Sequence, residues 1–190
     1  MNYADGSAKI TEYRQQIAEI RQKIRETQRT VEPQQVDDYE FQAFGGSIHL
    51  SQLFGRHEDL IVVHNMGTSC PSCTMWADGY NGIHHHVASR AAFVVSSPDM
   101  PDTQRKFAAS RGWTFPMVSH AGTTFAADMG YRSSKGGWLP GISVFQCKGK
   151  KIVRVSDAKF RPGDDFCAVW HMFDMLSGGA GDWSPKKQYA

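Results

Sequence analysis

Leu60–Trp76 reads LIVVHNMGTSCPSCTMW and joins an apolar run to two of the four cysteines in this 190-residue chain. The run LIVVHN is typical of a strand that is buried on both faces. If a helix begins at the cysteines, Pro71 occupies its first position, where a missing N–H costs nothing. Cys70 and Cys73 then lie one turn apart on the same helix face. The stretch therefore predicts a strand followed by a helix with two thiols at its N-terminus.

The segments after this stretch alternate between strand and helix patterns. Residues 91–97, AAFVVSS, are typical of a second buried strand, and residues 102–112 indicate a helix that Gly112 closes. Residues 115–119 predict another short strand. Residues 142–156 contain two β-rich runs split by Lys-Gly-Lys, which indicates an antiparallel hairpin. This order predicts an α/β domain with helices covering the sheet.

Two patterns extend the domain at its ends. Residues 39–54 read as two short strands around a Gly45-Gly46 turn. Residues 164–179 predict a closing helix, with Asp164 as its N-cap and Gly178 as its stop.

A strongly patterned amphipathic helix comes before the domain. Its apolar residues recur at spacings of three and four and end before Pro33: Ile10, Tyr13, Ile17, Ile20 and Ile24. This stripe either packs on its own domain or forms a short seam that joins two chains as a homodimer. We expect residues 1–32 to be a helical appendage and residues 33–190 to be one domain.

Composition excludes several classes of partner. Lysine and arginine number 21 and aspartate and glutamate 19, a balance too even to indicate nucleic acid or an acidic membrane surface. The sequence has no signal-peptide pattern and no apolar run of membrane-spanning length. We therefore expect a cytoplasmic protein, in which a Cys-x-x-Cys pair is more often catalytic or metal-binding than a structural disulfide.

The spacing of Cys70 and Cys73 permits redox chemistry. Cα atoms three residues apart in a helical turn are about 5–6 Å apart, within the range that a disulfide requires. The first thiol lies where free N–H groups favour a thiolate, so Cys70 is the expected nucleophile and Cys73 the resolving cysteine. Zinc is the alternative, because His86 completes a C-x2-C-x12-H pattern, but no histidine follows three to five residues later.

Other candidate ligands are weaker. Consecutive helical residues point about 100° apart, so His84–His86 cannot converge on one ion and are expected to be a partly exposed helix segment. Cys147 and Cys167 lie in apolar patterns and are expected to be unreactive core thiols. We expect no metal site and no cofactor.

Three motifs carry a resemblance that covers nearly the whole chain. CPSCTMWADGY, RGWTFPMVS and LPGISVF resemble an uncharacterised bacterial thioredoxin-like family of predicted dithiol-disulfide oxidoreductases. The resemblance implies a thioredoxin-like α/β fold: a central mixed β-sheet flanked by helices, with an N-terminal β-hairpin and the extra N-terminal amphipathic helix.

The resemblance also implies roles for individual residues. Cys70 and Cys73 match the dithiol, with Pro71 and Ser72 between them as supporting residues. Leu139-Pro140 stands where thioredoxin-like proteins carry a cis-proline that faces the cysteines, and Pro116 is a second candidate. A cis X-Pro bond is uncommon in folded proteins, at about one in twenty.

Two further side chains have alternative roles. His64 lies six residues before Cys70, where thioredoxins place a buried acid that handles the resolving cysteine's proton. It either handles that proton, since its ordinary pKa of about 6.5 suits transfer near neutrality, or is a core histidine bonded to its neighbours. Trp76 follows Cys73 by one turn and either shields the dithiol or packs under the sheet.

These features predict a thiol-disulfide oxidoreductase. Its expected partners are a disulfide-bearing protein or a small-molecule thiol substrate, together with an unidentified electron donor. A peroxiredoxin-like peroxidase is the enzymatic alternative, although the P-x-x-x-T-x-x-C pattern fails because Val63 and Gly67 stand at its first and fifth positions. A non-catalytic thioredoxin-like module that binds a partner or senses redox state is the other alternative.

Overall fold

The computed structural model describes residues 1–149 and 151–189 and divides into two compact units at Pro33. The first unit is α1 (Tyr3–Thr30), which begins where the side chain of Asn2 accepts a hydrogen bond from the backbone N–H of Asp5. The expected helix is therefore confirmed and begins earlier than its apolar stripe. α1 buries none of its side chains. A homodimer through this helix stays a prediction.

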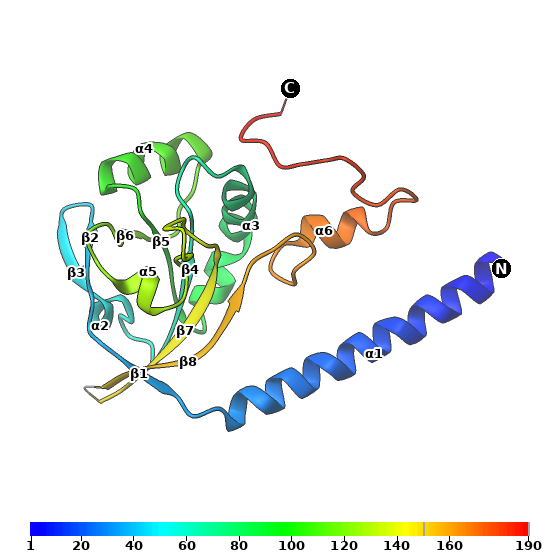
Figure 1. The fold of residues 1–190 in the computed structure, drawn as a ribbon, viewed down its shortest axis with the longest axis horizontal. Coiled ribbons are helices and arrows are strands. Elements are labelled where there is room, and N and C mark those ends of the chain that lie inside the picture. The colour runs from blue at the N-terminus through cyan, green and yellow to red at the C-terminus, as the bar shows by residue number, and fades with distance from the viewer. Residues whose placement is uncertain (150, 190) are drawn as a thin grey trace. The chain divides into compact units, whose positions relative to one another are not determined.

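The second unit, from Gln34 onward, is built on a mixed sheet, which has eight strands over the described residues (Figure 1). The strand order is β1-β8-β7-β4-β5-β6-β2-β3, with the central β4, β5 and β6 parallel and the other pairs antiparallel. The strands are β1 (Gln34–Val36), β2 (Glu40–Ala43), β3 (Gly46–His49), β4 (Asp59–His64), β5 (Ala92–Ser97), β6 (Met117–Ser119), β7 (Gly141–Lys148) and β8 (Lys151–Lys159).

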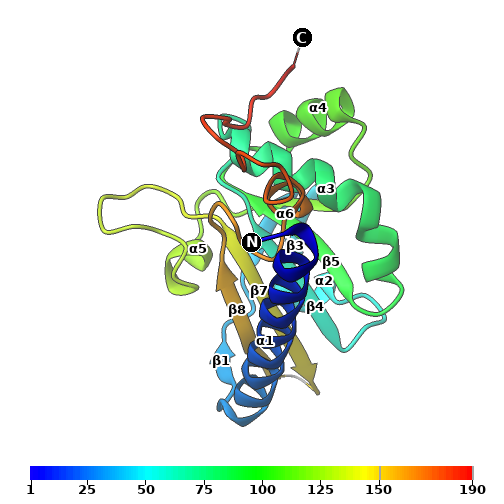
Figure 2. The same cartoon turned by 90° about the vertical axis from the view of Figure 1, so that its right-hand side faces the viewer.

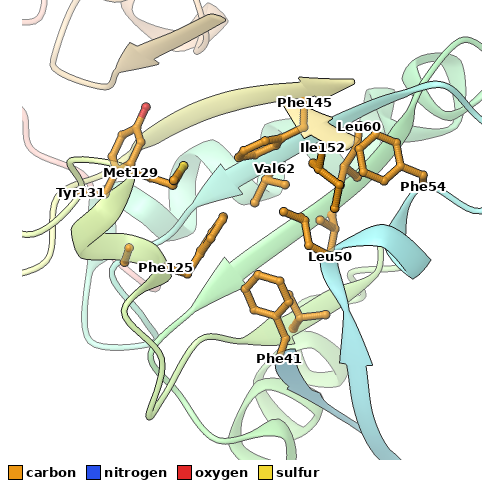
Figure 3. Close-up of a cluster of buried hydrophobic side chains, with 13 residues drawn as sticks. Phe41, Leu50, Phe54, Leu60, Val62, Phe125, Met129, Tyr131, Phe145 and Ile152 are labelled. Atoms are coloured by element: carbon orange, nitrogen blue, oxygen red, sulfur yellow. The ribbon is translucent and has the colours of Figure 1, made fainter. Parts of the chain in front are cut away.

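Helices cover both faces of this sheet. One face packs against α2 (Leu50–Leu53) and α5 (Phe125–Asp128), where the side chains from the strands and these helices converge (Figure 3). The other face packs against α3 (Pro71–Ala88), α4 (Pro101–Arg111) and α6 (Ala168–Phe173). Both views show α3 and α6 on the same side of the sheet (Figures 1 and 2).

Side-chain alternation along β4 separates the two cores. Leu60 and Val62 enter the core beneath α2 and α5, whereas Val63 enters the core beneath α3. Successive strand residues point to opposite faces, so His64 points to the same side as Val62. This alternation decides what His64 can contact.

Most of the expected elements are confirmed. The hairpin about Gly45-Gly46, the strand before the cysteines and the helix after them are present. Gly112 closes α4 with a φ of 68°, in the left-handed region that favours glycine. The β7–β8 hairpin is also confirmed, although Lys150 in its turn lies outside the described residues.

The expected N-cap of the last helix is wrong. α6 begins at Ala168 with Cys167 as its N-cap, and it ends at Phe173, well before Gly178. The Asp164 carboxylate instead accepts hydrogen bonds from the backbone N–H groups of Arg161 and Phe166, so it closes a turn before the helix. Among the described residues, no helix is long and apolar enough to cross a membrane.

Candidate functional site

The two cysteines lie at the start of α3, after the loop that follows β4. Cys70 is the N-cap residue, and its Sγ accepts a hydrogen bond of 3.1 Å from the backbone N–H of Cys73. Pro71 occupies the first turn as expected. The hydroxyl of Thr74 donates to the carbonyl of Cys70 over 3.0 Å, which fixes the first turn. The Cys70 sulfur therefore faces N–H groups that favour negative charge.

The two thiols differ in exposure and in acidity. Cys70 is partly exposed, whereas Cys73 is only 3% exposed. A hydrogen bond from the Cys73 thiol lowers the pKa of Cys70 to about 7 against the opposing effect of burial. The backbone N–H groups of Cys73 and Ser72 and the charge of Lys187 lower this pKa further. The same hydrogen bond, together with burial, raises the pKa of Cys73. The Cys70 thiol is thus partly exposed and acidic, whereas the Cys73 thiol is buried and protonated.

The short loop between β4 and Cys70 contacts the sulfur of Cys73. The backbone N–H of Met66 donates to the Sγ of Cys73 over 3.5 Å, and the side chain of Asn65 accepts from the backbone N–H of Gly67 over 2.8 Å. The loop is therefore held both to Cys73 and by its own polar side chain.

Asp99 anchors this loop from the end of the neighbouring strand β5. Its Oδ2 accepts from the backbone N–H of Thr68 over 2.7 Å. Gly67 passes the carboxylate at a φ of 97°, and a Cβ there would lie 2.9 Å from that oxygen. Sequence reasoning missed Asp99, although an acidic residue just after a parallel strand is a usable signal, because such strand ends meet at one edge of the sheet.

A small cavity lies beside Cys73, and three expected supporting residues line it: His64, Trp76 and Pro140. Trp76 is buried, stacks on Phe160 at a centroid distance of 5.4 Å and donates from Nε1 to Asp164 over 3.3 Å. Trp76 therefore packs in the core between α3 and the sheet, and it also lines the cavity next to Cys73. Pro140 lines the same cavity.

The expected cis-proline is wrong. Among the described residues every peptide bond is trans, including the bonds before Pro140 and Pro116. The Leu139 N–H donates to Tyr131 and the Pro140 carbonyl accepts from Phe160, so neighbouring hydrogen bonds hold the chain as it enters β7. A trans X-Pro bond is favoured by about 0.5–1 kcal/mol unless the surroundings oppose it.

His64 does not reach the dithiol through its side chain. Its imidazole stacks on Tyr131 at 3.7 Å and on Phe125 at 5.3 Å, on the face of the sheet opposite α3. Nε2 lies 2.9 Å from Oγ of Ser143, a buried hydrogen bond. Burial lowers its pKa well below the usual value, so the ring is neutral. The geometry is that of a core histidine.

The other cysteines and histidines stand apart from this site. Cys167 is buried and its pKa is raised by burial, whereas Cys147 is half-buried on β7 and donates to the Gly149 carbonyl. His84 packs edge-on to Phe115, while His85 and His86 are exposed on α3. The part of the chain that the structure describes holds no group of three His, Cys, Asp or Glu side chains placed to bind a metal.

The chain after α6 returns to the dithiol helix. Arg111 donates to the carbonyl of Lys187 over 2.7 Å and also pairs with Asp78 on α3. Asp78 accepts in addition from Nε1 of Trp113 over 2.8 Å. These contacts hold Lys187 where its charge acts on Cys70. Sequence reasoning missed this tail, because no local pattern marks it.

The comparisons with known proteins place the chain in a family. The family described as "Bacterial protein of unknown function (DUF899)" matches residues 7–189. The chain belongs to the DUF899 family. No match to the DUF899 chain was found among the curated proteins.

Solved structures similar to the DUF899 chain include several peroxiredoxins. A mutant of peroxiredoxin Q from Xanthomonas campestris matches with a TM-score of 0.54 at 18% identity, over 64% of this chain and 80% of that one. A mutant PrxQ from Xylella fastidiosa gives a TM-score of 0.58 at 14% identity, over 67% and 84%. Peroxidoxin BcpB from Mycobacterium tuberculosis gives 0.50 at 25% identity, over 67% and 80%. These matches confirm the thioredoxin-like fold.

Proposed function

We propose that this chain is a thiol-disulfide oxidoreductase in which Cys70 is the nucleophile and Cys73 the resolving cysteine. The asymmetry of the two thiols carries the proposal. Cys70 is partly exposed with a pKa of about 7, whereas Cys73 is buried and protonated. A thiol with a pKa near ambient pH is the most effective attacker in disulfide exchange.

The proposed reaction has two exchange steps. The Cys70 thiolate attacks one sulfur of a substrate disulfide, which forms a mixed disulfide and releases the other sulfur as a thiolate. Cys73 then attacks Cys70 Sγ as its proton passes to the second substrate sulfur, which closes the Cys70–Cys73 disulfide and releases that sulfur as a thiol. The substrate gains two electrons, and an external dithiol returns two electrons to the protein.

The proton of Cys73 needs an acceptor, and the leaving group is the best candidate. The residues that line the cavity beside Cys73 include no carboxylate: Val63, His64, Asn65, Trp76, Ala77, Tyr80, Pro140 and Phe160. The imidazole of His64 is turned to the other face of the sheet. We therefore assign the proton to the substrate sulfur that leaves as Cys73 attacks, so that proton transfer and sulfur exchange occur in the same step. The proposed compartment is the reducing cytoplasm.

A thiol peroxidase is the second candidate, and the structural neighbours favour it. Two of the solved structures described above are named peroxiredoxin Q or PrxQ, and the third is named a peroxidoxin. In that reaction the Cys70 thiolate attacks a peroxide oxygen and becomes a sulfenic acid while the peroxide leaves as an alcohol or water. Cys73 then condenses with the sulfenic acid and releases water. The missing P-x-x-x-T-x-x-C pattern weighs against this candidate.

Turnover measurements separate the two candidates. We would supply a dithiol reductant and measure the reduction of a small disulfide, hydrogen peroxide and an alkyl hydroperoxide by the wild type, Cys70→Ser and Cys147→Ser. We expect disulfide reduction that Cys70→Ser abolishes and Cys147→Ser preserves. Faster consumption of a peroxide than of the disulfide would assign the peroxidase reaction. Undiminished disulfide turnover in Cys70→Ser would refute the proposed nucleophile.

A further inference from the structure

A second cavity opens along α3, and Cys167 lines it, whereas Cys70 and Cys73 do not. Its volume is about 450 Å³, and it lies between α3 and the chain from Phe166 to Tyr189. Aromatic and aliphatic side chains make most of its wall: Met75, Trp76, Tyr80, Ile83, Phe166, Val169, Trp183 and Tyr189. A volume of roughly 300–1,000 Å³ with a mostly apolar wall is typical of a small-molecule site.

The two charged side chains that line this cavity, Asp78 and Lys186, differ in whether they have partners. Asp78 is already occupied, because Arg111 and Nε1 of Trp113 both donate to its carboxylate. Within the described residues, the ammonium group of Lys186 has no ion-pair partner. The cavity therefore combines an apolar interior with one uncompensated positive charge at its lining.

We propose that this cavity binds a small amphipathic anion. The apolar part of the ligand lies between α3 and the C-terminal segment, and its carboxylate lies at Lys186. The neutral Asp78–Arg111 pair neither attracts nor repels this head group, so Lys186 decides the preferred sign of charge. Neither Cys70 nor Cys73 lines this cavity, and it shares Trp76 and Tyr80 with the small cavity beside Cys73.

Two tryptophans line the cavity, so tryptophan fluorescence can report ligand binding. Trp76 and Trp183 line the cavity, and Trp170 packs edge-on against Trp183 at 5.6 Å. We would titrate the full chain with dodecanoate, below its micellar concentration, and follow tryptophan fluorescence together with calorimetry. Dodecanol and dodecyltrimethylammonium supply the neutral and cationic heads on the same chain. We expect one dodecanoate per protein, bound about fivefold tighter than dodecanol, with the cation weakest.

Two glycines on α3 provide a matched pair of variants. Gly79 lines the cavity and Gly82 does not, and a Cβ on either one meets no atom within 4 Å. Both substitutions by leucine remove a helix-weakening glycine, so both variants are expected to fold. Gly79→Leu places a side chain at the cavity and should weaken dodecanoate binding at least about tenfold, whereas Gly82→Leu should leave it unchanged.

A substitution at Lys186 tests the contribution of its positive charge to binding. Lys186→Met keeps an unbranched apolar stem and removes the ammonium, so dodecanoate binding should weaken about fivefold while dodecanol binding stays the same. Equal dodecanoate affinity in the wild type and Gly79→Leu would overturn the site. Equal affinity for the anion and the cation would overturn its assigned chemistry, and so would binding of many ligands per chain.

Discussion

The backbone N–H of Cys73 donates to Sγ of Cys70 over 3.1 Å, so Cys73 stabilises negative charge on the Cys70 sulfur. The Cys73 side chain adds the hydrogen bond that contributes most to the lowered pKa of Cys70. The two residues therefore act as a unit, and changing one alters the chemistry of the other.

Removing the Cys73 thiol should raise the pKa of Cys70 above its value of about 7. Cys73→Ala loses the side-chain donor, whereas Cys73→Ser keeps a hydroxyl donor and should raise the pKa less. The pH dependence of Cys70 alkylation, followed by mass spectrometry, measures the effect. Cys147→Ala is the control and should leave it unchanged. An identical alkylation profile in Cys73→Ala and the wild type would contradict this account of the pair.

The charge of Lys187 should contribute less than the Cys73 thiol. It is the last of the causes that lower the pKa of Cys70, and Arg111 holds its carbonyl in place. Lys187→Gln should raise the pKa of Cys70 by less than Cys73→Ala does, because a positive charge no longer favours the thiolate. Lys186→Gln is the neighbouring control. A larger shift in Lys186→Gln than in Lys187→Gln would show that the wrong lysine has been assigned.

A side chain at Gly67 should destabilise the fold, because its Cβ would lie 2.9 Å from the Asp99 carboxylate. Gly67 and Gly45 have nearly equal φ values, 97° and 99°, but a Cβ meets the Asp99 carboxylate only at Gly67. Alanine at either site carries the strain of a positive φ, and Gly67→Ala should lower the free energy of unfolding by at least about 1 kcal/mol more than Gly45→Ala. Chemical denaturation compares them. Equal losses in the two variants would mean that the loop shifts freely away from Asp99.

Acid should destabilise the fold through two buried histidines. Burial lowers the pKa of His120 from 6.5 to about 4, and it lowers that of His64 as well. Both rings are neutral in the folded state. As the pH falls, the same histidines in the unfolded chain take up protons at a higher pH than in the folded chain. Stability is therefore present above pH 6.5 and is lost as the pH falls towards 4, by about 3 kcal/mol for His120 alone.

Denaturation at several pH values checks this loss. His120→Gln should have a shallower decline of the unfolding free energy between pH 6.5 and 4, because the titrating group is gone. His85→Gln, on the exposed part of α3, is the control and should decline as the wild type does. A parallel decline in His120→Gln would assign the acid sensitivity to other groups.

The sequence was most informative where local pattern decides structure. β4 and α3 were predictable because an apolar run is followed by a proline at a helix start, and Gly45-Gly46 and Gly112 mark a turn and a helix end. Short elements were not predictable in this way. β1 has three residues and exists because it pairs with the edge of β8, a contact that depends on the finished sheet.

The candidate site was predictable only in part, for the same reason. The position of Cys70 and Cys73 at a helix N-terminus was predictable from the apolar run and Pro71, and their roles in the reaction stay a prediction. Asp99 and Lys187 lie far along the chain and reach the site through tertiary contacts. Strand alternation makes His64 and Val63 point to opposite faces, but sequence alone does not say which face α3 covers.

Trapping of a mixed disulfide tests the central claim most directly. Cys73→Ser removes the resolving thiol, so incubation with a small disulfide should leave one adduct per chain, and peptide mass spectrometry should place it on Cys70. The same treatment of Cys70→Ser should leave Cys73 unmodified, because that thiol is buried and its pKa is raised. An adduct on Cys73, or none on Cys70 in Cys73→Ser, would contradict the account.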